Sequence, residues 1–298
     1  MKIKLLIILL LTSTLGFSQG EASNWFFGGN AGIKFENDGS VTTLSVSPNP
    51  IMIQTTEGCS AYSDVAGNLM LYTDGRTVWD RNHVEMPNGD YNNLTGLLGD
   101  PSSTQSAIIV PKPGDPNIYY IFTVDEPHQD NRDTYPLQNT NVSFEEDDGF
   151  NNGFNYSVVD MSIIGENGSI GDITVRNTHL VTYDPDPNGE EIKYKCSEKI
   201  TAVKAADNSG YWVVTQFVDK FYSFKVDANG VNETPIVTQI APTVPVSGYR
   251  RNSIGQLKAS PDGTKISIAH QQLGTSKGGT TSNGKVYLYD FNNQNGVV

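Results

Sequence analysis

The sequence is poor in cysteine, in basic residues and in stretches with helical periodicity. Only two cysteines occur among its 298 residues, which is weak evidence for a disulfide. Lysine and arginine number 20 against 33 aspartates and glutamates, so the net charge is −13. This acidity repels phosphate backbones and argues against a nucleic-acid partner. Abundant Gly and Asn, frequent Tyr and Phe, and the scarcity of helical periodicity together favour an all-β fold.

The first 18 residues have the pattern of a secretory signal peptide. Lys2 and Lys4 precede the apolar run Leu5–Leu11, and small residues stand at the cleavage positions of Gly16-Phe17-Ser18. The apolar run is too short to span a bilayer, and no later run is long enough. We expect residues 1–18 to be removed, leaving residues 19–298 as one secreted domain without a transmembrane segment. Its net charge would be −15, from 18 basic and 33 acidic residues.

One short motif recurs along the chain. The segment Lys258–Ala269 has the sequence Lys-Ala-Ser-Pro-Asp-Gly-Thr-Lys-Ile-Ser-Ile-Ala, which predicts two strands joined by a tight Asp-Gly turn. Weaker copies of this turn lie at Gly67, Gly114 and Gly210. Strands are predicted directly after the four turns, at Leu69–Thr73, Ile118–Val124, Tyr211–Gln216 and Ile266–His270.

A second series of turns follows strands rich in aromatic residues. The two series interleave with a shared period, which predicts units of four strands in about 45–50 residues. This period indicates a β-propeller of four-stranded antiparallel blades, about five of them visible. A β-sandwich, the alternative, does not explain two interleaved series. The turns are at Gly39, Gly89, Gly168, Gly230 and Gly296, after strands such as Gly32–Glu36, Tyr156–Met161, Phe221–Asp227 and Val286–Phe291.

The period also predicts how the ring begins and ends. The first blade starts near Trp25 with a strand of the second-strand type, without a first strand before it. Because a closed ring needs its edges paired, we expect residues beyond 298 to complete it. Cys59 begins the first strand of blade two, whereas Cys196 precedes that of blade four. Non-adjacent blades hold them too far apart for a bridge, so we predict two unpaired thiols.

The predicted blades carry insertions that point to one face. The segments 125–153 and 271–284 fall between second and third strands, and 183–194 connects two blades. In a four-stranded meander these connections emerge on the same face, which is typical of a binding surface. Neutral insertion into tolerant loops is the alternative. The candidate binding residues on these loops are Asp125, Glu126, His128, Asp147 and Asp148.

One acidic loop has the beginning of a calcium-binding pattern. Asp184, Asp186 and Asn188 supply oxygen ligands at positions one, three and five, and a glycine follows at position six. Position twelve is Lys195, so the closing acid is absent unless a neighbouring glutamate replaces it. Ca²⁺ is therefore the only cofactor that we consider. The acids around His128 are better explained as a solvated loop than as a metal site.

Several segments resemble the N-terminal propeller-like region of large surface proteins exported by the type IX secretion route. Many such proteins end in a gliding-motility-associated C-terminal sorting domain. The resemblance covers most of the chain and implies an exported WD-like propeller followed by adhesion modules; it implies no catalytic residue. The chain departs from the pattern by ending before any sorting domain. The similar segments are Asn24–Gly28, Thr56–Cys59, Leu71–Gly75, Val78–His83, Met86–Gly89, Ser103–Ala107, Tyr119–Thr123, Ser197–Lys199 and the Lys258–Ala269 hairpin.

Two functions from different classes follow. The first is a secreted, non-catalytic propeller that binds protein or polysaccharide at the cell surface through its loop-rich face. The second is a glycosidase with paired carboxylates in the central channel. No Gly-x-Ser-x-Gly or His-Glu-x-x-His motif occurs, and each available acid has a simpler account as a turn residue, cap or solvated group. We therefore expect no enzyme activity. The acids are Asp64, Asp74, Asp125, Asp160 and Glu198.

Overall fold

The computed structural model describes residues 20–44, 53–126, 152–182, 196–244, 252–273 and 284–298. These residues form five antiparallel sheets and three short 3₁₀ helices, η1 (Gly20–Ala22), η2 (Pro87–Gly89) and η3 (Tyr91–Asn93). No helix within these ranges is long and apolar enough to cross a membrane. The predicted all-β class is confirmed, while the predicted signal peptide lies outside the described residues.

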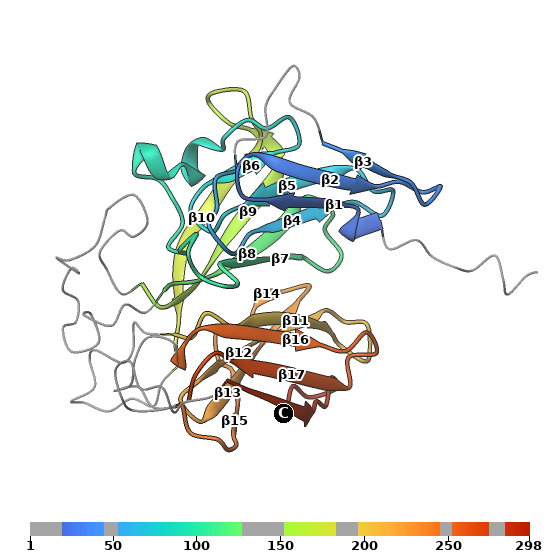
Figure 1. The fold of residues 1–298 in the computed structure, drawn as a ribbon. Coiled ribbons are helices and arrows are strands. Elements are labelled where there is room, and N and C mark those ends of the chain that lie inside the picture. Colours follow the sequence, from blue (N-terminus) through green and yellow to red (C-terminus); the bar gives the residue numbers. More distant parts are fainter. Residues whose placement is uncertain (1–19, 45–52, 127–151, 183–195, 245–251, 274–283) are drawn as a thin grey trace, which may run out of the picture.

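Each sheet is a meander of consecutive strands (Figure 1). Sheet A contains β1 (Asn24–Phe27), β2 (Ala31–Phe35) and β3 (Val41–Thr43), and sheet B contains β4 (Ser60–Ser63), β5 (Leu69–Thr73) and β6 (Val78–Asp80). Sheet C contains β7 (Ala107–Pro111), β8 (Ile118–Val124), β9 (Phe154–Ile164) and β10 (Ile170–Leu180). Sheet D contains β11 (Ile200–Lys204), β12 (Tyr211–Phe217) and β13 (Lys220–Asp227), with β14 (Gly230–Val231) and β15 (Ile236–Gln239) both paired to β13. Sheet E contains β16 (Gly255–Ala259), β17 (Lys265–His270) and β18 (Lys285–Asp290).

The β16–β17 hairpin shows how the local sequence forms these meanders. Gly263 has a φ of +68°, a conformation that glycine adopts without strain. The Thr264 N–H donates to Asp262 Oδ1 at 3.1 Å, which fixes the turn. Beyond it, Ile266 and Ile268 are fully buried. The two-residue alternation therefore places one face of the hairpin on the core.

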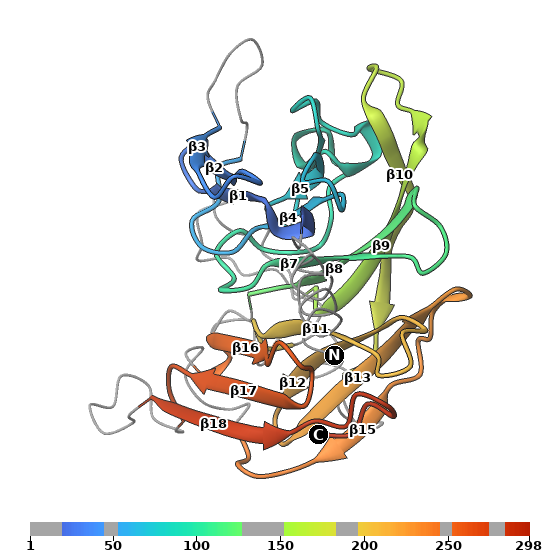
Figure 2. The ribbon, with the colours of Figure 1, turned by 90° about the vertical axis from the view of Figure 1, so that its right-hand side faces the viewer.

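The five sheets are blades of a β-propeller. In Figure 2 they radiate from a centre, with β4, β7, β11 and β16 nearest to it. Successive first strands are parallel: the Gly58 N–H donates to Ser103 O at 3.0 Å, and farther along both strands the Ile109 N–H donates to Ser60 Oγ at 3.3 Å. A common direction for the first strands is the arrangement that a propeller requires.

Sheet A differs from the other blades in how it begins. Asn24 Nδ2 donates to Ser63 Oγ at 2.9 Å, and the Cys59 thiol donates to Phe26 O at 3.2 Å, so β1 runs antiparallel to β4. β1 therefore has the direction of a second strand, as predicted. In the described part of the chain its other edge pairs with no strand. No closed ring is formed by these residues, and closure by residues beyond 298 stays a prediction.

The core consists of four apolar layers, one between each pair of neighbouring blades. Phe26 and Tyr72 pack between sheets A and B, and Leu71, Ile109 and Ile121 belong to the layer between B and C. The layer between C and D is rich in aromatic residues, and the one between D and E is mainly aliphatic. Their principal members are Phe122, Phe154 and Phe224 in the former and Val214, Ile266 and Ile268 in the latter.

The predicted strand positions agree closely with the structure, but four full strands per blade is an overestimate. β5 and β8 have the predicted bounds, and the other predicted strands differ at their ends by a few residues. Within the described ranges, sheets A, B and E have three strands each. In sheet B a single bridge between Trp79 and Glu85 marks the position of a fourth strand.

Candidate functional site

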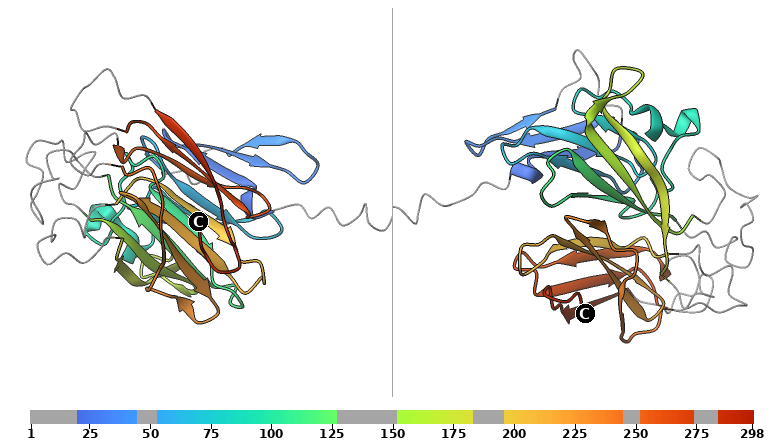
Figure 3. Two further views of the ribbon diagram at one scale, coloured as in Figure 1. Left: turned by 90° about the horizontal axis from the view of Figure 1, so that it is seen from below. Right: turned by 180° about the vertical axis from the view of Figure 1, so that it is seen from behind.

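The connections between blades and those between second and third strands emerge together, as the insertions predicted. Gly99 donates its N–H to Gly75 O at 3.0 Å, and Glu198 donates to Ser253 O at 3.2 Å. We call this side the loop-rich face and the side of the first-to-second turns the turn face. They lie left and right in Figure 1 and exchange sides in the rear view of Figure 3. The loop-rich face comprises residues 28–30, 53–59, 74–77, 91–106, 123–126, 152–153, 196–199, 216–219, 252–254 and 270–272.

Asp125 and Glu126 lie at the base of the loop that follows β8. Both are almost fully buried, with 2% and 3% exposure. Asp125 Oδ2 accepts a hydrogen bond from the Asn152 N–H at 2.6 Å, which ties the two ends of the connection together. These two acids therefore anchor the loop rather than present a charge to a partner. The other candidates on this loop, His128, Asp147 and Asp148, lie outside the described residues.

The calcium candidates Asp184, Asp186 and Asn188 also lie outside the described residues, so this prediction stays open. Within the described ranges, no three or more His, Cys, Asp or Glu side chains form a group suited to a metal ion. Two of the other acids considered for catalysis accept local backbone hydrogen bonds. Asp64 caps its own turn by accepting from Ala66 N, and Asp160, within β9, accepts from Ser162 N.

A polar network links three blades near the centre of the loop-rich face. The Thr104 N–H donates to Glu198 Oε2 at 2.9 Å. The Gln105 side chain spans two further blades: its Oε1 accepts from Ile200 N at 3.2 Å and from Leu257 N at 2.7 Å, and its Nε2 donates to Leu257 O at 3.2 Å. Blades three, four and five are thereby joined through one side chain.

Burial dominates the electrostatics of this network. It raises the pKa of Glu198 to about 7, with the Glu126 charge adding to the effect and hydrogen bonds from Thr104 opposing it. It lowers the pKa of Lys199 to about 7, although Glu198 opposes this shift. Lys199 Nζ donates to the carbonyls of Asn252 and Ser253 at 3.2 and 2.7 Å. Burial and the Lys199 charge also lower the pKa of His270 to about 3.

A buried ion pair fixes the neighbouring part of the face. Arg76 Nη2 lies 2.7 Å from Asp100 Oδ2, and the two side chains are 5% and 2% exposed. Burial raises the pKa of Asp100 to about 6, against the opposing effect of Arg76. Asp74 Oδ1 accepts from the N–H groups of Arg76 and Thr77, both at 2.8 Å. The turn between β5 and β6 is therefore fixed by two charged side chains, Asp74 through backbone hydrogen bonds within the turn and Arg76 through its ion pair with Asp100.

One pair of carboxylates comes close together at this face. The Thr104 hydroxyl oxygen lies 2.9 Å from Glu198 Oε2 and 3.3 Å from Glu57 Oε2. The distance between Glu57 Oε2 and Glu198 Oε2 therefore cannot exceed the sum of these two distances. This upper limit is close to the separation of about 5 Å between the two carboxyl groups of retaining glycosidases. Glu57 is exposed, but Glu198 is only 1% exposed and is capped by Thr104. This geometry suits a structural anchor better than a proton donor to a substrate.

Both cysteines are free, as predicted. The Cys196 thiol contacts Gly153 O at 3.3 Å and is fully buried, which raises its pKa well above the ordinary value. Burial raises the pKa of Cys59 to about 11. Neither thiol has the lowered pKa of a reactive cysteine.

Several buried polar atoms of the loop-rich face lack a hydrogen-bond partner within the described ranges. His270 and Gln272 are 3% and 6% exposed, yet His270 Nδ1 and Gln272 Nε2 donate to or accept from no group there. Such atoms are rare in folded proteins and commonly mark places where water or a ligand binds. The others at this face are Ser103 Oγ, Ser106 Oγ, Thr123 Oγ1 and Gln216 Oε1.

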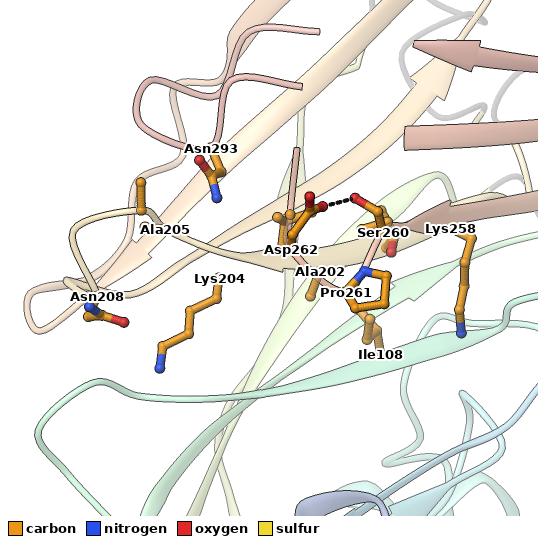
Figure 4. Close-up of a pocket in the computed structure, with 15 residues that line it drawn as sticks. Ile108, Ala202, Lys204, Ala205, Asn208, Lys258, Ser260, Pro261, Asp262 and Asn293 are labelled. Carbon is orange, nitrogen blue, oxygen red and sulfur yellow. Dashed lines mark hydrogen bonds between the residues drawn. The ribbon is translucent and has the colours of Figure 1, made fainter. Parts of the chain in front are cut away.

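The turn face carries a depression of a different kind. It has a volume of about 500 Å³ and lies between β11, β16 and Ile108 of β7. Figure 4 shows Lys204 and Lys258 on its two sides, with Pro261 and Asp262 between them. Ser260 donates to Asp262 Oδ1 at 2.6 Å, and both lysines are exposed. None of the ionisable side chains that line it is buried, so we do not place the functional site here.

No protein-family model matches this chain. No curated protein matches it either. Among solved structures, a hypothetical selenium-binding protein from Sulfolobus tokodaii is similar over 88% of the chain, with 8% identity and a TM-score of 0.31. The β-propeller domain of Cps50 (Swd1) from Myceliophteria thermophila is similar over 91%, with 11% identity and a TM-score of 0.37. The chain spans 64% of the first protein and 75% of the second. The strand order and the contacts between blades identify the fold of this chain.

Proposed function

We propose that this chain is a secreted, non-catalytic β-propeller module that binds protein or glycan partners through its loop-rich face and acts in adhesion at the cell surface. The observation that carries the proposal is the group of buried polar atoms without partners at that face. Because these atoms are buried, their hydrogen-bonding capacity suits water molecules held beneath a bound partner. The long connections that begin and end beside them supply additional contact area.

Export and surface display are the second element of the proposal. They are supported by the signal-peptide pattern of residues 1–18 and by the resemblance to the propeller-like regions of type IX-secreted, gliding-motility-associated proteins. Export is tested by recovering the protein from the culture medium and sequencing its N-terminus. A mature chain that begins near Gln19 supports the proposal, whereas a retained Met1 in a cell-associated protein contradicts it.

Binding is tested with a variant that removes one of these polar side chains without breaking a hydrogen bond within the described part of the protein. Gln272→Ala leaves the described hydrogen bonds in place, because Gln272 Nε2 has no partner in the described part of the chain. We expect unchanged thermal unfolding but weaker binding to immobilised polysaccharides or surface-protein extracts, measured by biolayer interferometry. Lys204→Ala, in the depression of the turn face, is the matched control and should bind like the parent chain. Equal binding by both variants would contradict the proposed face.

The glycosidase alternative is favoured by one observation, the Glu57–Glu198 pair bridged by Thr104. Its test is the release of reducing sugar from a polysaccharide panel by the parent chain and by Glu198→Gln. Activity that falls by a factor of about 10² or more in Glu198→Gln, as expected for loss of a general acid, would favour the enzyme. We expect no release from either protein. Calorimetric titration after chelator treatment tests the calcium candidate separately, and no heat at millimolar Ca²⁺ would exclude it.

A further inference from the structure

A second cavity opens on the loop-rich face, between sheets A and B. Its volume is about 520 Å³, within the range of small-molecule sites. It is bounded by the β1–β2 turn, by the chain before β4, by the β5–β6 turn and by η3. The charged, aromatic and amide side chains that line it include Asp74, Arg76, Trp79, Glu85, Tyr91 and Asn92.

The walls of this cavity are held in place by contacts outside it. Trp79 stacks on Tyr72 with ring centroids 5.2 Å apart. The Arg76 guanidinium, anchored by Asp100, lies over the Tyr91 ring at 4.7 Å. Asp74 is fixed by two backbone N–H groups of its own turn. A ligand would therefore meet a preformed site, which reduces the entropy cost of binding.

The chemistry of the lining selects the class of ligand. Burial is the main reason that two acids, Asp74 and Glu85, have raised pKa values, and the charges of Asp90 and Asp74 add to the effect on Glu85. Carboxyl groups of this kind accept hydrogen bonds from hydroxyls and repel anions. The exposed Asn92 supplies an N–H donor and the half-buried Tyr91 supplies flat apolar surface, while Arg76 and Trp79 are almost fully buried behind them.

We infer that this cavity binds a neutral pyranose unit of an extracellular polysaccharide. A sugar ring presents hydroxyls at its edge and C–H groups on its faces, which matches acids and amides beside aromatic rings. The inference rests on the proposed function, since it names a ligand class for the same face. It does not require the glycosidase alternative, because Glu57 and Glu198 do not line the cavity.

The test uses the 19–298 chain and five defined probes in calorimetry: cellohexaose, laminarihexaose, N-acetylchitohexaose, the anionic hexamannuronate and the basic peptide tetralysine. At least one neutral hexasaccharide should bind, and hexamannuronate should bind at least about tenfold more weakly because of charge repulsion. Glu85→Gln should weaken the neutral sugar about tenfold, the usual loss when a charged hydrogen-bond partner is removed. Asn92→Ala, at an exposed position, provides a second variant that should fold normally.

The control is Lys204→Ala on the turn face, which should bind the sugar like the parent chain. The inference is overturned if no neutral hexasaccharide binds, or if Glu85→Gln and Asn92→Ala both bind like the parent chain. Preferential binding of tetralysine would assign the cavity to a basic peptide and also overturn it. A sugar whose binding is lost in Gln272→Ala but kept in Glu85→Gln would overturn this site alone and leave the proposed function standing.

Discussion

The two faces of this propeller differ in the burial of their charged side chains. On the loop-rich face Glu198, Lys199 and the Arg76–Asp100 pair are buried, and the loss of water shifts the pKa values of Glu198, Lys199 and Asp100. On the turn face Asp262 and its equivalents are exposed and cap the turn beside them. The difference shows that the exposed charge of Asp262 serves its own hairpin, whereas the buried charges of the loop-rich face join segments far apart in the sequence. Four pairs of substitutions test this contrast.

The largest effect is expected at the buried ion pair. Arg76→Met leaves Asp100 as a buried carboxylate without its cation, which should lower the free energy of unfolding by about 3–5 kcal/mol. Lys265 forms the corresponding pair with Asp290 on the exposed hairpin, where the side chains are 49% and 88% exposed. Lys265→Met should leave stability essentially unchanged. Urea denaturation measures both, and equal losses would refute the contrast between the faces.

The next largest effect is a dependence on pH. Because the pKa of Glu198 is raised to about 7, the folded state binds a proton that the unfolded state releases between its ordinary pKa and pH 7. Stability should therefore fall as the pH rises through this window, by on the order of 2 kcal/mol for this group. Glu198→Gln should remove this group's share of the slope in thermal unfolding measured from pH 4.5 to 8, while the shares of Asp100 and His270 remain.

The turn face supplies the control for this experiment. The hydrogen bonds from Ser260 and Thr264 lower the pKa of Asp262, so its contribution is lost only as the pH falls below the ordinary value. Asp262→Asn should therefore keep the slope of the parent chain between pH 4.5 and 8. A slope that persists unchanged in Glu198→Gln would show that other groups cause it.

A smaller loss is expected at Gln105. Gln105→Ala removes three hydrogen bonds from blade three to blades four and five, which should lower the free energy of unfolding by about 2 kcal/mol. Gln239 is a suitable comparison, because its Nε2 makes one exposed hydrogen bond to Asp219. Gln239→Ala should cost no more than about 0.5 kcal/mol. Hydrogen exchange of β16 should accelerate only in Gln105→Ala if the side chain couples the blades.

The smallest effect concerns glycine. Gly114 has a φ of +81° on the turn face, and a Cβ there would meet no atom within 4 Å, so Gly114→Ala should cost about 1 kcal/mol of backbone strain. A Cβ on Gly99 would lie 2.6 Å from Gly75 O, which cannot move aside without breaking their hydrogen bond. Gly99→Ala should therefore be the more destabilising of the two in urea denaturation. The opposite order would mean that the loop-rich face adapts more easily than its packing indicates.

The sequence predicted the fold far better than the site. Local signals such as the Asp-Gly turn before β17, and the alternation of Ile266 and Ile268, depend on neighbouring residues and can be recognised without the fold. The positions of the insertions followed from the same register. Fold and blade count could therefore be inferred from repeated short-range patterns.

The site depends on contacts between residues far apart in the sequence. Nothing local marks Arg76 as the partner of Asp100, or Gln105 as a contact of Leu257. One signal was available: Ser103–Ala107 and Ser197–Lys199, two segments that carry the resemblance to known surface proteins, contain Gln105 and Glu198. Asp125 and Glu126 were correctly assigned to the loop-rich face, but the sequence could not show that they are buried.

The Gln105 side chain limits how modular this propeller can be. Each apolar layer joins only two neighbouring blades, so repeats held together by these layers alone could in principle be exchanged, duplicated or deleted as units. Gln105, however, reaches from blade three past blade four to the backbone of blade five. Inserting a blade between these positions would separate the Gln105 amide from its backbone partners. The order of the three blades is therefore fixed by a single amide, and growth by duplication is easier to accommodate in blades one and two.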